Sequence, residues 1–111
     1  MAHSSVVIHG GLVIRTMTRA GAMLVWLEGE LDISSRAALR RLLRSLDLET
    51  TRLLDVDLAK VTFCDIGGYQ ALVVVAQIAR AVGLNVRMHS APALLRRVAQ
   101  LDAPGTPPLL E

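Results

Sequence analysis

The chain is predicted to fold as one α/β domain, with a mixed sheet of four to five strands and helices packed on it. Apolar segments of strand and helix length follow one another in the order ββαβαβα. The short turn Arg19-Ala20-Gly21 favours antiparallel pairing of the first two strands. The later strands are separated by helices, which predicts parallel crossovers between them.

The length of 111 residues is enough for a single domain with a core of its own. We place this core at about residues 12–101, between a frayed N-terminus (1–5) and a proline-containing tail (102–111). The composition is 52% apolar and 20% charged, which is typical of a globular protein. Only 3% of the residues are aromatic, so the core must be built mainly from aliphatic side chains.

Charge and hydropathy exclude several classes of function. The longest uncharged apolar run, Tyr69 to Ala79, is too short to span a bilayer, and the N-terminus lacks a secretory pattern. We therefore expect a cytoplasmic protein without direct membrane insertion. The net charge of +2 does not indicate a nucleic-acid partner, and no aromatic residue interleaves the row Arg36, Arg40 and Arg44 to stack on bases.

The first half of the chain is predicted to contain two strands and a helix. Strands at 12–18 and 22–27 follow a short extension at 6–8, and Gly29-Glu30-Leu31-Asp32 then breaks the second strand. Asp32 or Ser34 can cap a helix that runs to about Leu46. The apolar stripe of this helix is Leu39, Leu42, Leu43 and Leu46, and its opposite, solvated side carries Arg36, Arg40 and Arg44.

The second half is predicted to contain strand 51–58, helix 69–82, strand 84–88 and helix 91–101. Gly83 suits the left-handed position that ends a helix. Pro92 suits the first turn of the last helix.

The most informative stretch is Val61-Thr62-Phe63-Cys64-Asp65-Ile66-Gly67-Gly68-Tyr69. It indicates the end of a buried strand, a tight acidic loop and the start of a very apolar helix. With Asp57 before it and Gly29-Glu30-Leu31-Asp32 upstream, it resembles the signature of STAS domains, the family of bacterial anti-sigma factor antagonists. That signature ends in Asp-Ser-Ser-Gly at a helix start, and here Ile66 and Gly67 replace the two serines.

The resemblance implies a partner-binding site at this loop. In regulated members a partner kinase phosphorylates the first serine, and the position held by Ile66 has no hydroxyl to accept phosphate, so no phosphorylation is expected there. The expected partner-contact residues are Asp32, Asp65, Ile66, Gly67, Gly68, Tyr69 and Val73. Asp32 and Asp65 have a second interpretation, as helix caps only.

The helix that follows the loop has an unusually narrow polar strip. Gln70, Val74, Gln77 and Ala81 share one face at helical spacing. Two explanations stay open: the helix is covered by its neighbours in the fold, or it offers a docking face, including one for a homodimer.

The sequence does not indicate an enzyme. There is no nucleophile–base arrangement, no metal-ligand spacing and no phosphate-binding loop, so catalytic residues, metals and cofactors are not expected. Cys64 is interpreted as a small core residue.

Two functions are consistent with the resemblance. The first is a protein-binding regulator like an anti-sigma factor antagonist, whose partner is an anti-sigma factor of the ATPase-fold kinase type. The alternative is a STAS accessory domain of a membrane transport system, such as lipid ABC transport or an anion transporter.

Overall fold

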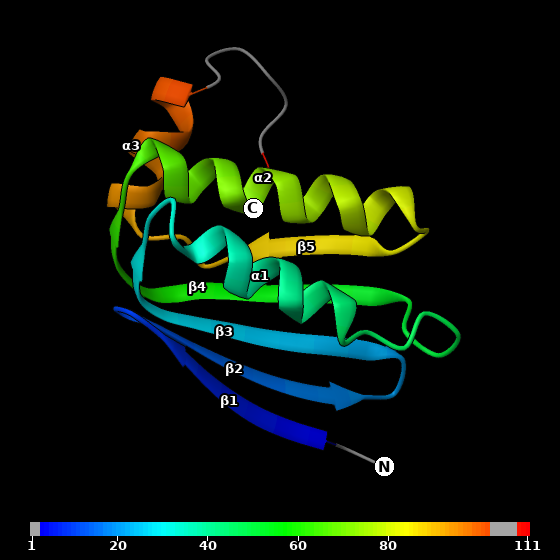
Figure 1. The fold of residues 1–111 in the computed structure, drawn as a ribbon. Coiled ribbons are helices and arrows are strands. Elements are labelled where there is room, and N and C mark those ends of the chain that lie inside the picture. The colour runs from blue at the N-terminus through cyan, green and yellow to red at the C-terminus, as the bar shows by residue number, and fades with distance from the viewer. Residues whose placement is uncertain (1–2, 103–108) are drawn as a thin grey trace.

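A five-stranded mixed sheet with the strand order β1-β2-β3-β4-β5 forms the centre of the molecule (Figure 1). The computed structural model describes residues 3–102 and 109–111. Its elements are β1 (His3–His9), β2 (Leu12–Arg19), β3 (Ala22–Leu31), α1 (Ser35–Arg44), β4 (Leu53–Cys64), α2 (Ile66–Ala81), β5 (Asn85–His89) and α3 (Ala93–Asp102). The predicted fold class is confirmed, with one strand more than the order of elements predicted from the sequence.

The pairing of the strands follows the lengths of their connections. β1, β2 and β3 pair antiparallel through short turns, whereas β3, β4 and β5 pair parallel because α1 and α2 connect them. Since both crossovers move along the sheet in one direction and crossovers are right-handed, α1 and α2 lie on the same face (Figure 1).

The core lies between this face and the helices. Met23, Val25 and Leu27 of β3 are buried, while the alternating Leu24 and Trp26 are only partly buried on the other face. The face that carries Leu24 and Trp26 is called the open face below. Leu39 of α1, Leu72 of α2 and Leu95 of α3 complete the core, each with at most 2% of its surface exposed.

The N-terminal prediction was wrong in part. Residues 3–5 were expected to fray, but they belong to β1, which pairs with β2 along its whole length. Residues 1–2 and the tail residues 103–108 lie outside the described residues. Leu110 is buried and bridges to Met88, so the end of the chain lies beside β5.

The sequence predicted that the strand breaks at Gly29, but β3 bends there and continues. The φ of +102° at Gly29 is available to glycine, and the register between β3 and β4 shifts on either side of it. A Cβ at this position would lie 2.2 Å from the carbonyl oxygen of Gly11. The strand therefore passes close to the neighbouring turn and continues to Leu31.

The remaining elements differ from prediction mainly at their ends. β4 runs on to Cys64 instead of ending at Leu58, α2 begins at Ile66, and Gly83 follows α2 with a φ of +93° as expected. Ser34 stands at the start of α1 but makes no side-chain capping bond. Among the described residues, no helix is long and apolar enough to cross a membrane.

Candidate partner-binding site

The Asp32 turn and the Asp65 loop meet at one edge of the sheet. They follow the carboxyl ends of the parallel strands β3 and β4, where Leu31 pairs with Cys64. The amide of Asp65 donates a hydrogen bond to the carbonyl oxygen of Leu31 at 3.3 Å. The structure thus brings together two motifs that lie more than 30 residues apart in the chain.

Asp65 is the N-cap of α2. Its backbone is extended, and its Oδ1 accepts a hydrogen bond from the amide of Gly68 at 2.7 Å. This bond satisfies one of the free N–H groups of the first turn. Because a capping residue immediately precedes its helix, α2 begins three residues earlier than predicted.

The two glycines of the loop set how closely α2 approaches β3. A Cβ on Gly68 would lie 2.3 Å from the carbonyl oxygen of Leu31, which leaves no room for a side chain. A Cβ on Gly67 would lie 3.1 Å from the Cβ of Ile33. Gly68 is therefore buried in the helix–strand contact, and Gly67 lies beside the Asp32 turn.

Asp32 organises the turn that leads into α1. Its Oδ1 accepts hydrogen bonds from the amide of Ser34 at 2.9 Å and from the Ser34 hydroxyl at 2.5 Å. The Ser34 hydroxyl lowers the pKa of Asp32 most, and the Ser34 and Ser35 amides lower it further. Asp32 is thus held as a carboxylate at neutral pH, on the part of the turn that faces solvent.

Two isoleucines project from this edge. Ile66 is 48% exposed, and Ile33, which the sequence reasoning did not single out, is 69% exposed. We call the residues Asp32, Ile33, Asp65, Ile66 and Gly67 the docking surface, after the partner contact predicted from the sequence. The signal for Ile33 was available in the sequence, because it is an apolar residue between Asp32 and Ser34 in an otherwise polar turn.

The docking surface leaves out three of the expected contact residues: Gly68, Tyr69 and Val73. Tyr69 is only 5% exposed and belongs to the core, so the structure does not support a surface contact for its ring. Burial raises the pKa of Tyr69, and the charge of Asp102 adds to this effect. Val73 is partly buried and packs against the core.

Burial by neighbouring elements explains the narrow polar strip of α2. The helix contacts α1, α3 and the sheet, and seven of its residues are buried. Gln70 and Gln77 are exposed, and Gln70 donates to Asp102 of α3 at 2.9 Å. The covered-helix explanation therefore accounts for the pattern without a docking partner.

Cys64 is buried beneath the Asp65 loop. Burial raises the pKa of its thiol to about 11, with a smaller contribution from the charge of Asp65. The thiol donates to the carbonyl oxygen of Asp65 at 3.3 Å. A protonated, buried thiol is a poor nucleophile, which agrees with a packing role.

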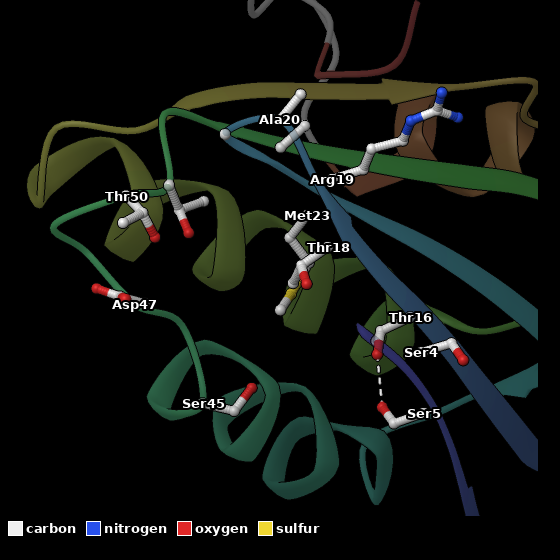
Figure 2. Close-up of a pocket in the computed structure, with 13 residues that line it drawn as sticks. Ser4, Ser5, Thr16, Thr18, Arg19, Ala20, Met23, Ser45, Asp47 and Thr50 are labelled. Atoms are coloured by element: carbon white, nitrogen blue, oxygen red, sulfur yellow. Dashed lines mark hydrogen bonds between the residues drawn. The ribbon is translucent and has the colours of Figure 1, made fainter. Parts of the chain in front are cut away.

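A cavity lined by hydroxyl groups lies at the opposite end of the sheet (Figure 2). It has a volume of about 530 Å³ and lies between the first strands and the loop after α1. Ser5 and Thr16 form a hydrogen bond at its wall, and the guanidinium of Arg19 points away from Ser45 and Asp47 (Figure 2). Since few charged groups converge on this cavity, we do not assign it a ligand.

A polar cluster links β4 and β5. His89 Nε2 lies 2.6 Å from Asp55 Oδ1, and His89 Nδ1 lies 2.9 Å from the Ser90 hydroxyl. These are the residue types of a hydrolase triad. However, Ser90 does not line the cavity shown in Figure 2. We therefore interpret the cluster as a set of hydrogen bonds that stabilises the pairing of β4 and β5.

Within residues 3–102 and 109–111, no group of three or more His, Cys, Asp or Glu side chains is placed to hold a metal ion. The candidate site therefore consists of one turn and one loop that present two carboxylates and two exposed isoleucines.

Comparison with protein families identifies a match that covers most of the chain. The family model described as "Mlab, STAS domain" matches residues 14–103. No curated protein gives a significant match.

Solved structures share the fold at low sequence identity. The anti-sigma factor antagonist SpoIIAA in its unphosphorylated form has a TM-score of 0.67 and 14% identity, over 98% of this chain and 86% of that one. An anti-sigma factor antagonist from Mycobacterium paratuberculosis has a TM-score of 0.60 and 19% identity, over 91% and 77%.

A membrane protein contains a similar domain. The murine anion transporter Slc26a9 has a TM-score of 0.62 and 21% identity, over 71% of this chain. This chain covers only 13% of that transporter's length, and 15% of a second SLC26A9 structure. At such identities these likenesses establish the fold.

Proposed function

The chain belongs to the STAS domain family, and from this premise we propose that it is a protein-binding regulator that acts as an anti-sigma factor antagonist. The observation that carries the proposal is the docking surface, where Ile33 and Ile66 are exposed beside the carboxylates of Asp32 and Asp65. Exposed apolar side chains within a polar rim are typical of protein contact sites. The proposed partner is an anti-sigma factor of the ATPase-fold kinase type.

The proposed binding is not controlled by phosphate at the usual position. A phosphate on the first residue of α2 would lie at a helix N-terminus, where free amides and the helix dipole favour negative charge. Ile66 occupies that position and has no hydroxyl. Its hydrocarbon side chain instead adds apolar surface to the site.

Binding measurements test this proposal directly. Calorimetry with each anti-sigma kinase of the source cell is expected to show binding to at least one, with equal affinity with and without ATP. Ile66→Asp is expected to weaken it at least tenfold, since the substitution places a charge in an apolar contact. Gln100→Asp, on the exposed side of α3, is the matched control and is expected to leave binding within twofold.

A variant that regains a site for phosphorylation provides a sharper test of the proposal. Ile66→Ser restores a hydroxyl at the start of α2, and ATP is expected to weaken kinase binding by this variant alone. Failure of the wild-type protein to bind every such kinase would contradict the proposed function. Phosphate incorporation into the wild-type protein would contradict only the absence of a switch.

A second candidate is an accessory domain of a membrane transport system. The similarity to part of the anion transporter Slc26a9 favours it, since such a domain acts within or beside a larger assembly. Affinity purification from native membranes distinguishes the two candidates: co-purification of a permease or its ATPase supports transport, and co-purification of an anti-sigma factor supports regulation.

A further inference from the structure

The other end of the helical layer carries a groove that differs in charge from the docking surface. α1 and α2 run side by side in the same direction. Ile33 and Gly67 lie together at the starts of the two helices, and residues at the ends of both helices line one groove. The groove has a volume of about 300 Å³. Its apolar lining consists of Leu43, Leu46, Leu48, Ile78, Ala79 and Val82.

The apolar lining is unusually accessible. Leu48 and Val82 are each 50% exposed, and Ile78 is 39% exposed. Large apolar side chains that gather at one exposed hollow are typical of a contact surface rather than of a solvated one. A few apolar side chains of a partner fit a groove of this size.

The rim of the groove is strongly basic. Arg40 and Arg44 line it, and Arg36 and Arg41 extend the charge along α1, which contains no acidic residue. In the described part of the chain, none of these four side chains forms an ion pair. Asp47 follows α1, but its Oδ1 accepts from the amide of Glu49. Four arginines against the two carboxylates of the following loop, Asp47 and Glu49, leave the rim with a net positive charge.

The spacing of the arginines indicates the shape of the partner. Arg36, Arg40 and Arg44 are four residues apart and span about 12 Å along α1. Carboxylates at every fourth position of a second helix would have the same spacing, and arginine binds carboxylates through paired hydrogen bonds. Aliphatic residues beside those carboxylates would enter the groove.

We propose that the groove between the ends of α1 and α2 binds an acidic amphipathic helix of another protein. The geometry fits the mode in which a helix places its apolar face in a groove while charges along its edge select the partner. The groove lies at the opposite ends of both helices from the docking surface, and the row of arginines on α1 also lines a second hollow that reaches Ile33. The proposal does not depend on the function proposed above.

Two other occupants fit the surface less well. A second copy of this chain offers no such helix, since its described helices carry one acidic residue, Asp102. An anionic lipid surface would be expected to meet aromatic anchors, as interfacial proteins usually have. The groove lining has none, Tyr69 is buried, and Trp26 lies on the open face. The third aromatic residue, Phe63, is exposed but lies at the end of β4 beside the Asp65 loop, away from the groove.

A labelled peptide tests the proposal. The probe is a 16-residue helical peptide with Glu at three positions four apart and Leu beside each, and binding is measured by fluorescence anisotropy with the intact protein. Arg40→Gln with Arg44→Gln is expected to weaken binding at least tenfold, and Ile78→Ser at least fivefold. Arg97→Gln on α3 is the control, expected to change affinity less than twofold. Raising the salt concentration is expected to weaken binding steadily.

Several results would overturn the proposal. These are a peptide with Lys in place of Glu that binds equally well, or Arg40 and Arg44 variants that bind the acidic peptide like the wild type. The proposal would also be wrong if the protein did not bind the acidic peptide in low salt. It would be wrong as well if the protein floated with phosphatidylglycerol vesicles but did not bind the peptide. Circular dichroism confirms that each variant is folded. The docking-surface variant Ile66→Asp is expected to bind the peptide like the wild type.

Discussion

Gly68 lies where the start of α2 passes closest to the end of β3. Its missing side chain matters because a Cβ would meet the Leu31 carbonyl oxygen at 2.3 Å, and that oxygen belongs to a paired strand that cannot easily move. Gly67 is different, since its nearest neighbour is the Ile33 side chain in an exposed turn. The two adjacent glycines therefore have different roles.

Gly68→Ala is expected to lower the free energy of unfolding by about 1–3 kcal/mol through overpacking. Gly67→Ala is expected to stay within about 0.5 kcal/mol of wild type, because the higher helix propensity of alanine offsets the contact with Ile33. Urea unfolding followed by the fluorescence of Trp26 measures both. Equal effects of the two substitutions would contradict this account of the helix–strand contact.

Cys64 provides a test by pH. Because burial raises the pKa of its thiol to about 11, the folded state favours the protonated form. Its contribution to stability is therefore fully present below the unfolded pKa of about 9 and is lost as the pH rises through 11, by about 3 kcal/mol at most. Tyr69, whose pKa is also raised by burial, acts in the same direction at higher pH.

The free energy of unfolding is accordingly expected to fall between about pH 9 and 11. Cys64→Ala should make this fall smaller while leaving the Tyr69 part. At pH 8, a thiol reagent is expected to modify Cys64 slowly in the native protein and rapidly in urea. Rapid modification of the native protein would show that the thiol is accessible.

At the scale of elements, α1 has few local features that stabilise a helix, and its surface carries a strong positive charge. It lacks a side-chain cap at Ser34 and has no acidic residue in its first turn. Arg40 lies four residues from both Arg36 and Arg44, and like charges at this spacing destabilise a helix. A row that costs stability is easier to understand if it has a binding role.

Arg40→Glu is therefore expected to raise the free energy of unfolding by about 1 kcal/mol at low salt, and by less at high salt. The substitution turns two repulsive pairs into attractive ones. Arg97→Glu on α3 has no charged neighbour at this spacing and is expected to change stability by less than about 0.5 kcal/mol. Thermal and urea unfolding at two salt concentrations check the result, and a loss of stability on Arg40→Glu would contradict it.

At the scale of the whole molecule, the helices cover one face of the sheet and the chain end extends one edge. Leu110 is 6% exposed and bridges to Met88 of β5. The amide of Glu111 donates to the Met88 carbonyl oxygen at 2.8 Å, and its carboxylate accepts from Arg87 at 2.7 Å. The last residues therefore complete the core at this edge.

Leu110→Ala is expected to lower the free energy of unfolding by about 2–3 kcal/mol, as for other buried leucines. Leu101→Ala is the matched control, because Leu101 is 73% exposed, and its expected change is less than about 0.5 kcal/mol. Chemical unfolding measures the difference. Equal stability of the two variants would show that the end of the chain does not contribute to the core.

Local patterns in the sequence were enough to predict most of the fold. Alternating apolar residues, the Arg19–Gly21 turn and Gly83 specify strands, a hairpin and a helix end, because each acts on its nearest neighbours in the chain. The predictions of element ends were less accurate. Gly29 signals a break by itself, but pairing with β2 and β4 on both sides keeps the strand intact.

The features of the candidate site were likewise predictable only in part. The sequence by itself determined the family, the acidic loop and the absence of a hydroxyl at Ile66, since these depend only on residue identity and spacing. Only the tertiary structure decided that Tyr69 is buried, that Ile33 joins Ile66 at one edge, and that the arginines of α1 border an apolar groove. Burial and adjacency depend on how distant segments pack, and local periodicity does not contain that information.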